Sequence, residues 1–460
     1  MSQTTNPDSS TFSRLIARHG RLTLIALAVI LIAGFGLRMD KVVNPLAEPG
    51  DDAFAYRALA ESLYEEQSFG GPDFNTPSDW SPGAPLLYAG AYYMTGGVRD
   101  GVGRGVQALL GTAAIVIAFL LALRLSRRRS AALLAAAFVA FYPPFIHSTG
   151  ALMSEPPAIF TLPAAVLAFL WADSRGSPWA WLLPGFLFGL TTLIRPEYLA
   201  VAFAFGILLL VRRWSAARPD RRIQLRSALL GGLAFGVAVF VPIVPWTVHN
   251  YVTLDRFVPL TTGSGKATFV GTYLPADGEY QQVKAELHET YTGESLDPDS
   301  DELEAVDPVP LFDREAESAY PGLSRDAALG RIGKDNFGKY LKEDPLGYAG
   351  MTVRKVGRMW GTGIGEVMSG SLGSLVQKAL VLAGLAGLGL LAWRRRWEAI
   401  AMGIPVVVVT AVGALTLAPP RRNEILMTLV LPLAALALAD AAVWIRGRID
   451  GPRPEIEEAA

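Results

Sequence analysis

A succession of apolar segments, each close to the length that crosses a lipid bilayer, constrains this chain more than any other feature. A helix needs about 20 apolar residues to cross about 30 Å of hydrocarbon. About ten segments approach that length, at 22–38, 104–124, 131–147, 156–172, 179–195, 198–211, 228–248, 374–393, 399–418 and 425–445. The mean hydropathy of +0.32 is also high for a soluble protein. The sequence therefore predicts an α-helical polytopic membrane protein with about ten transmembrane helices.

The positions of the arginines predict how these helices are oriented. Arginine clusters lie at 127–129, 212–226, 394–396 and 446–448. If the spans alternate, all of these clusters lie on the side of the N-terminus, and such clusters favour the cytoplasm. We therefore expect cytoplasmic tails at 1–21 and 447–460, with the first span retained as an anchor. Prolines interrupt three short segments, so the number of spans within 148–211 stays open.

Two long stretches between the spans lie on the extracytoplasmic side in this scheme. They divide the chain into an N-terminal transmembrane module at 22–248, which contains a first external loop at 39–103, an external loop region at 249–371 and a C-terminal transmembrane module at 372–446. Apolar residues recur at helical spacing within 52–66 and 331–360, which predicts helices along the membrane interface. The stretch 261–273 is rich in turn-forming and β-branched residues.

An acidic pair, Asp51 and Asp52, follows directly after the first span. One interpretation is structural, because aspartate caps helix N-termini and is favourable there. Capping uses only one carboxylate, however, and crowded like charges at a membrane boundary are typical of a functional site. A carboxylate placed in this way can accept a proton from an alcohol. Asp79, in a proline-rich return to the membrane, is a weaker candidate for a second acidic group.

Several arginines on the external side depart from the general charge distribution. Arg421 and Arg422 form a pair at the rim of the last span, where guanidinium groups can bind a lipid-linked phosphate. Snorkelling toward lipid headgroups is the alternative interpretation. Arg195 is a second rim arginine, and an ion pair with Glu155 or Glu197 is as consistent with its position as a ligand site.

Taken in order, these segments resemble the lipid-phosphosugar-dependent glycosyltransferases of the GT-C superfamily, especially the bacterial protein O-mannosyltransferases and aminoarabinose transferases. The resemblance lies in Asp51-Asp52, the helix and proline-rich return at 53–85, Ser154-Glu155, Arg195-Pro-Glu197 and the segment 244–251 with its His249-Asn250. It covers most of the chain. The sequence departs from the family at His249, where arginine is more usual, at Asp52, where several members differ, and at Pro420-Arg-Arg-Asn-Glu424, which replaces an Arg-Tyr-Arg-x-Pro pattern.

The resemblance implies transfer of a sugar from a polyprenyl-phosphate donor to a hydroxyl of an envelope glycan, lipid or protein. It places this reaction at the extracytoplasmic face of a bacterial cytoplasmic membrane and, with a single carboxylate base, predicts inversion of the anomeric carbon. Asp51 is the favoured base and Asp52 the alternative. The resemblance also implies substrate-binding roles, which we assign to Arg421, Arg422, Arg195, Glu155, Glu197, Tyr56, His249 and Asn250.

The same residues bear on other possible ligands and functions. Asp52 and Glu155 offer the oxygen ligands that a divalent cation requires, and the sequence leaves such a cation open. A transporter or flippase for a charged or lipid-linked sugar is the alternative function, but charges near the midplane and duplicated halves are not evident. The chain has no cysteine, which excludes thiol chemistry. Gly263-Ser-Gly-Lys266 lacks the spacing of a nucleotide-binding loop, and no nucleic-acid partner is expected.

Overall fold

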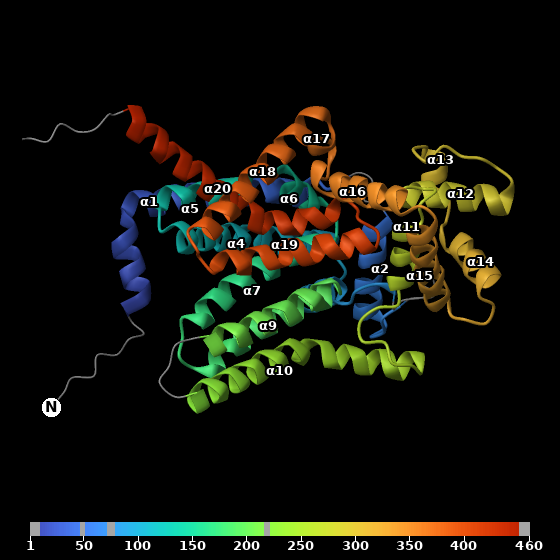
Figure 1. Cartoon of the computed structure of the whole chain (residues 1–460), viewed down its shortest axis with the longest axis horizontal. Helices are drawn as coiled ribbons and strands as arrows, with labels where there is room; N and C mark the ends of the chain where they lie inside the picture. The colour runs from blue at the N-terminus through green and yellow to red at the C-terminus, as the bar shows by residue number, and fades with distance from the viewer. Residues whose placement is uncertain (1–9, 47–50, 71–78, 216–220, 450–460) are drawn as a thin grey trace, which may run out of the picture.

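The computed structural model describes residues 10–46, 51–70, 79–215 and 221–449. Within these residues the chain is helical and contains no strand. The long apolar helices run roughly side by side (Figure 1). The N-terminal part of the first helix and the C-terminal part of the last lie at one end of this bundle, and α11–α15 lie at the other (Figure 1). The predicted α-helical membrane fold is therefore confirmed.

The helices of the N-terminal half are α1 (Ser10–Val43), α2 (Asp51–Glu65), α3 (Gly83–Thr95), α4 (Asp100–Ser126), α5 (Arg129–Phe141), α6 (Pro143–His147), η2 (Ser148–Gly150), α7 (Glu155–Asp173), η3 (Pro178–Trp181), α8 (Leu182–Ile194), α9 (Tyr198–Ser215) and α10 (Arg221–Leu254). Those of the C-terminal half are α11 (Ser264–Thr272), α12 (Tyr280–Thr292), α13 (Asp301–Glu304), α14 (Val309–Ala319), α15 (Arg325–Glu343), α16 (Pro345–Gly361), α17 (Glu366–Ser369), α18 (Ser371–Trp393), α19 (Glu398–Leu415) and α20 (Arg421–Ile449).

Among the described residues, eight helices are long and apolar enough to cross a membrane, and they coincide with eight of the predicted segments. The segment 131–147 is instead a bent pair of helices with an angle of 51° between them. Counting this pair as one span gives nine. The segment 179–195 forms the shorter apolar helix Pro178–Ile194. The ten segments predicted as transmembrane helices are thus all helical, and eight of them, or nine with the bent pair, are long and apolar enough to cross a membrane.

The bend in the pair α5–α6 follows from two consecutive prolines. Pro143 and Pro144 lack backbone N–H groups, and proline disfavours the helical conformation of the residue before it, so Tyr142 is extended, with φ −68° and ψ 116°. The break leaves carbonyl groups at the end of α5 without helical partners. The guanidinium of Arg38, which is fully buried, donates to the carbonyls of Val139 at 3.0 Å and Ala140 at 3.1 Å.

Glycines allow two pairs of membrane helices to pack closely. On α8, a Cβ added at Gly185 or Gly189 would lie 2.4 or 2.3 Å from a carbonyl oxygen of α10. On α18, a Cβ at Gly387 would lie 2.0 Å from the carbonyl oxygen of Leu433 on α20. Small residues at such positions let helix backbones approach each other within a membrane. Larger side chains at these positions would separate the helices.

Helices α11–α16 form a helical subdomain, residues 264–361, with a small core of its own. The core contains Phe269, Val270, Ala276, Val283, Leu287, Leu311, Phe312, Ala316, Ala328 and Leu329. The stretch 261–273, which looked turn-rich in the sequence, contains helix α11. Its glycines serve close packing, because a Cβ at Gly265 would lie 2.0 Å from the carbonyl oxygen of Asp326 on α15. The composition of this stretch reflects tertiary contacts.

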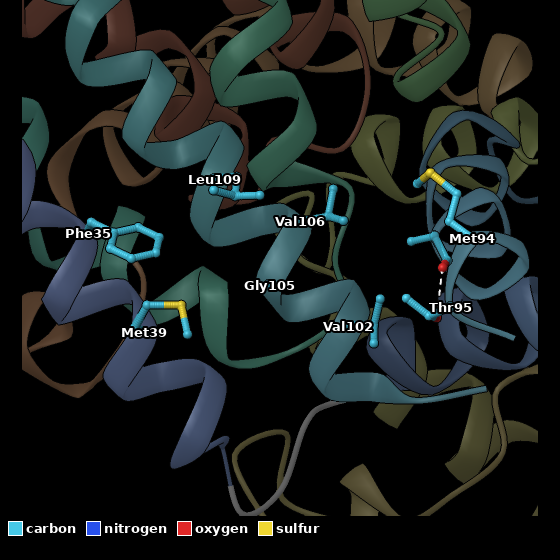
Figure 2. Close-up of a pocket in the computed structure, with 9 residues that line it drawn as sticks. Phe35, Met39, Met94, Thr95, Val102, Gly105, Val106 and Leu109 are labelled. Carbon is cyan, nitrogen blue, oxygen red and sulfur yellow. Dashed lines mark hydrogen bonds between the residues drawn. The ribbon is translucent and has the colours of Figure 1, made fainter. Parts of the chain in front are cut away.

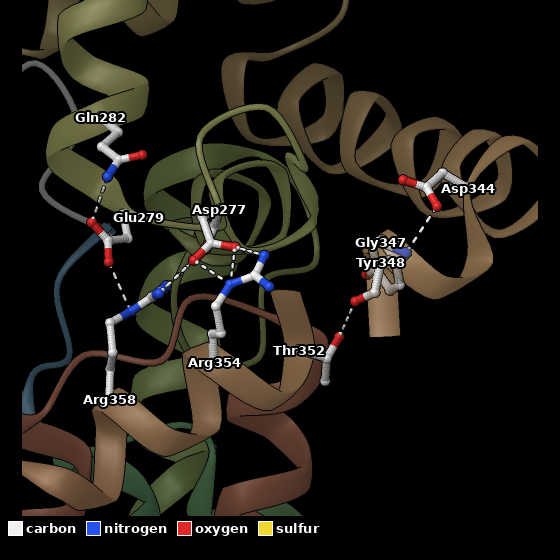
Figure 3. Close-up of polar contacts among 9 residues, drawn as sticks. All are labelled: Asp277, Glu279, Gln282, Asp344, Gly347, Tyr348, Thr352, Arg354 and Arg358. Carbon is white, nitrogen blue, oxygen red and sulfur yellow. Dashed lines mark hydrogen bonds and ion pairs between the residues drawn. The ribbon is translucent and has the colours of Figure 1, made fainter. Parts of the chain in front are cut away.

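An ion-pair network, the Asp277 corner, joins the turn between α11 and α12 to helix α16 (Figure 3). Asp277 accepts from Arg354 Nε at 3.1 Å and from Arg354 Nη2 at 2.6 Å, and it pairs with Arg358 as well. Arg358 Nε lies 2.7 Å from Glu279 Oε1. The turn contains Asp277 at φ 50° and Gly278 at φ 67°. The two arginines therefore fix a turn whose backbone is left-handed at two successive residues.

Candidate functional site

Helices α2 and α20 meet at their N-terminal ends, where Asp52 and Arg421 form an ion pair. The side chains of Asp52 and Arg421 are 24% and 37% exposed, so a ligand can reach both. A carboxylate is favourable at the positive end of a helix dipole, whereas a guanidinium at that end is not. The first turn of α20 therefore concentrates positive charge. The side chain of Asp51, the other half of the predicted acidic pair, lies outside the described part of the chain.

A second ion pair lies deeper, between Arg195 at the end of α8 and Glu155 in the first turn of α7. The Glu155 side chain is 1% exposed and that of Arg195 is 12% exposed. Arg195 Nη1 is also 3.6 Å from Glu197 Oε1. A buried carboxylate is costly without a countercharge. The alternative of a helix-joining ion pair for Arg195 is thus present in the structure, alongside any ligand role.

Arg422 continues the positive charge of α20 toward this second pair. Its Nη1 donates to Thr416 Oγ1 at 3.1 Å, and its guanidinium interacts electrostatically with Glu197. Burial alone would raise the pKa of Glu197, but Arg422 and then Arg195 outweigh burial, and the pKa is lowered. Glu197 is consequently an ionised counterion at neutral pH.

Tyr56 of α2 faces the Arg195–Glu155 pair. It is buried, and its ring contacts that of Trp80 edge to face at 5.3 Å between centroids. Burial raises the pKa of Tyr56 to about 12, with a smaller contribution from Glu155 and an opposing one from Arg195. The phenol is therefore neutral at physiological pH and can donate a hydrogen bond.

Glu424, three positions after Arg421 on α20, is a functional candidate that the sequence analysis did not single out. It is 2% exposed, and the hydroxyl of Ser148 is the hydrogen-bonding group beside its carboxylate. It interacts electrostatically with Glu155, Arg195 and Arg421. Its only sequence signal was an acidic residue in the first turn of an apolar helix, two positions after an arginine pair.

We call these seven residues the charged cluster: Asp52, Glu155, Arg195, Glu197, Arg421, Arg422 and Glu424. Four segments that are distant in sequence contribute to it, namely α2, α7, the α8–α9 connection and α20. The buried amide of Asn423 fixes the start of α20, because it donates to the carbonyl of Thr362 at 2.8 Å and to that of Met359. The cluster therefore combines three guanidinium groups with four acidic side chains at one end of the bundle.

Three predicted site residues make different contacts. Asp79 pairs with Arg325 and accepts a hydrogen bond from Thr262, which joins the first loop to the helical subdomain. His249 stacks on Trp246, with 4.7 Å between ring centroids. The Asn250 amide donates to the carbonyls of Val258 and Leu260, both at 3.0 Å. These contacts position the connection between α10 and the helical subdomain.

A divalent cation needs several oxygen ligands in one place. Among the described residues, no group of three His, Cys, Asp or Glu side chains could hold a metal ion. The two carboxylates considered from the sequence, those of Asp52 and Glu155, are each paired with an arginine. The described side chains therefore do not provide a cation site by themselves.

An apolar pocket of about 370 Å³ lies between α1, α3 and α4 (Figure 2). Its lining consists of Phe35, Met39, Ala91, Met94, Thr95, Val102, Gly105, Val106 and Leu109. The only hydroxyl in this lining, that of Thr95, is bonded within α3, to the carbonyl of Ala91 at 2.9 Å. The surface is suited to hydrocarbon.

Comparison with known proteins bears on the fold of this chain. Residues 87–259 match the family model of the dolichyl-phosphate-mannose-protein mannosyltransferases, a range that includes Glu155, Arg195 and Glu197. The structure also matches the oligosaccharyltransferase AglB of Archaeoglobus fulgidus in complex with an inhibitory peptide and a dolichol-phosphate, with a TM-score of 0.54 over 95% of this chain at 17% identity. This chain has a GT-C-like fold. The resemblance drawn from the sequence is confirmed at that level.

Two further solved structures were matched to this chain. The same archaeal enzyme, tethered to an acceptor peptide containing the NVT sequon, matches 95% of the chain with a TM-score of 0.55 at 15% identity. The chain spans 52% of the length of that enzyme. ArnT of Cupriavidus metallidurans bound to undecaprenyl phosphate matches 94% of this chain and 81% of its own, with 14% identity and a TM-score of 0.40. No curated protein sequence matches the chain.

Proposed function

We propose that this protein is a membrane glycosyltransferase that moves a sugar from a polyprenyl-phosphate donor to a hydroxyl of an envelope glycan, lipid or protein. The observation that carries the proposal is the meeting of α2 and α20, which pairs a candidate base with a candidate phosphate ligand. Glycosyl transfer from a lipid phosphate needs both groups within one site. The matches to the mannosyltransferase model and to a structure that contains dolichol-phosphate support the same class of donor.

The reaction divides between these groups as follows. The acceptor hydroxyl attacks the anomeric carbon, and its proton passes to the carboxylate of Asp51 or Asp52. The new C–O bond forms as the bond between the anomeric carbon and the phosphate oxygen breaks. Arg421 and Arg422 stabilise the negative charge that develops on the departing lipid phosphate. A single displacement inverts the anomeric configuration.

We place the reaction at the extracytoplasmic face of a bacterial cytoplasmic membrane. Helix α7 supports this placement, because Glu155 lies at its first turn and Asp173 at its last, about 27 Å apart for 18 steps along a helix. Asp173 pairs with Arg212, with 2.6 Å between Oδ2 and Nη2, in one of the arginine clusters. Such clusters favour the cytoplasm, so the charged cluster belongs to the opposite side.

A transfer assay tests this function directly. The purified full-length protein would be incorporated into proteoliposomes and supplied with radiolabelled polyprenyl-phosphate sugars and an envelope acceptor fraction. We expect transfer, and we expect Asp51→Asn or Asp52→Asn to reduce it by a factor of about 100 or more. Asp173→Asn, at the other end of α7, is the matched control and should retain activity. Movement of the lipid-linked sugar across the bilayer without transfer to an acceptor would instead establish the transporter function.

A further inference from the structure

Arg421 has two candidate partners, the Asp52 carboxylate and the phosphate of the donor, and one guanidinium group cannot bind both fully at the same time. In the structure it is paired with the Asp52 carboxylate. In the proposed reaction it binds the phosphate of the donor, while Asp52 is one of the two candidate bases. A carboxylate that is engaged by a guanidinium is stabilised in its charged form and is a weaker proton acceptor. While this ion pair is formed, the Asp52 carboxylate is a poor base and the Arg421 guanidinium is not free to bind phosphate.

The exposure of this pair allows it to exchange partners. The Asp52 and Arg421 side chains are 24% and 37% exposed, whereas those of Glu155 and Arg195 are only 1% and 12% exposed. Breaking the deeper pair would leave a buried charge without a partner. Breaking the outer pair exposes both groups to solvent or ligand, which is far less costly.

The start of α20 favours a phosphate over a single carboxylate. Arg421 is the first residue of the helix and Arg422 the second, so two guanidinium groups adjoin the positive end of the helix dipole. Helix N-termini and paired arginines both favour phosphate oxygens. Glu424 lies within electrostatic reach of Arg421. Arg421 therefore keeps an acidic neighbour on its own helix when it leaves Asp52.

We propose that the lipid-linked phosphate takes Arg421 from Asp52, and that donor binding thereby frees the Asp52 carboxylate for the acceptor hydroxyl. This inference rests on the proposed function and adds a binding order to it, with the donor before the acceptor. Without a donor the Asp52 carboxylate stays paired with Arg421, so this candidate base is not free to activate a hydroxyl. Arg421 thus links the two events, because Asp52 becomes able to accept a proton only when phosphate is bound to Arg421.

Thermodynamic reciprocity supplies a test that needs no turnover. If phosphate and Asp52 compete for Arg421, phosphate can bind only after the Asp52–Arg421 ion pair breaks. Removing the Asp52 carboxylate must therefore strengthen phosphate binding by the free energy of that ion pair. A partly exposed ion pair contributes about 1 kcal/mol, which corresponds to about a fivefold change in Kd. We expect Asp52→Asn to lower the Kd for polyprenyl monophosphate by about that factor. The measurement is thermophoresis of the full-length protein in nanodiscs, with uncharged polyprenol of the same chain length as the reference ligand.

A double-mutant cycle separates competition for Arg421 from simple charge repulsion. In the Arg421→Ala background, Asp52→Asn should leave the Kd unchanged within about twofold. Asp173→Asn, which removes the acid of an ion pair at the other end of α7, should also leave the Kd unchanged. Asp52→Ser replaces Asp52→Asn if the latter does not elute as a monodisperse species.

Three results would overturn the inference. Tightening of equal size in the Arg421→Ala background would mean that Asp52 acts on phosphate by repulsion alone. No tightening in the otherwise native protein would mean that the two groups do not compete. Wild-type protein that binds polyprenyl monophosphate no better than polyprenol would overturn the proposed phosphate ligand and this inference with it. The first two results leave the proposed function standing.

Discussion

The charged cluster and the Asp277 corner contain the same kinds of side chain but use them differently. In the corner, Asp277 is bonded by two arginines and Arg358 is bonded in turn by Glu279 (Figure 3). In the cluster, the buried carboxylate of Glu424 lies beside the Ser148 hydroxyl and is within electrostatic reach of Arg195 and Arg421, but neither arginine is bonded to it. A saturated network stabilises a fold, whereas a buried polar group with few partners indicates a place where a ligand can complete the bonding.

The largest effect should come from breaking the buried pair within the cluster. Arg195→Met leaves Glu155, at 1% exposure, without its guanidinium, and we expect a loss of about 3–5 kcal/mol of stability. Thermal unfolding in detergent measures it. Adding Glu155→Gln in the same chain removes the stranded charge, so the double variant should recover a large part of the loss. Equal stability of the single and double variants would contradict a buried ion pair.

We expect Arg421 to be required for the rate of sugar transfer but not for folding. Because its side chain is 37% exposed, Arg421→Ala should change the melting temperature little. Loss of a group that stabilises transition-state charge should lower kcat/KM by about 10²- to 10³-fold. Steady-state transfer by the proteoliposome assay measures this. If activity falls only in proportion to the loss of folded protein, Arg421 stabilises the fold, as the arginines of the Asp277 corner do, and is not required for the reaction itself.

A smaller effect is expected at the Asp277 corner, and it should appear in stability alone. Asp277→Asn removes the charge that two arginines contact, at a cost of about 1 kcal/mol, a low value because Arg354 is 58% exposed and solvent screens the pair. Transfer activity per folded molecule should be unchanged. Altered kcat at unchanged stability would show that the corner takes part in the reaction.

The pH dependence of that stability should be the smallest effect. Burial would raise the pKa of Asp277, but hydrogen bonds from Arg354 and Arg358 outweigh burial, and the pKa is lowered. A carboxyl whose folded-state pKa is depressed stabilises the fold above its unfolded pKa, about 3.9, and loses that contribution as the pH falls through the folded value. The difference in melting temperature between wild type and Asp277→Asn should therefore be constant from about pH 5 to 7 and shrink below about pH 4. A difference that persists at lower pH would contradict an ionic contribution.

The sequence predicted the membrane helices because hydrophobic length is a local property. It did not predict that 131–147 bends by 51°, although Pro143-Pro144 was a visible signal, because the bend depends on how the freed carbonyls are satisfied. Arg38 satisfies them from another helix. Local composition also misjudged the start of the subdomain, where Gly265 lets helix α11 pack closely against α15.

The charged residues of the cluster are visible in the sequence, but their pairing is not. A contact between Asp52 and Arg421, which are separated by 369 positions, has no local signature. The same reason hides Glu424, since its burial exists only in the folded chain. Asp51 and the choice between the two aspartates stay predictions, to be decided by the transfer assay.

The separation of Asp52 and Arg421 along the chain has a consequence for biosynthesis. Helix α2 is made early, whereas α20 is the last helix of the described chain. A ribosome that stalls before α20 would release a membrane-inserted fragment with the acidic half of the pair and without its arginines. Such a fragment would keep Arg195 but lack Arg421 and Arg422, the two phosphate ligands of the proposed reaction, so we expect an incomplete product to transfer no sugar.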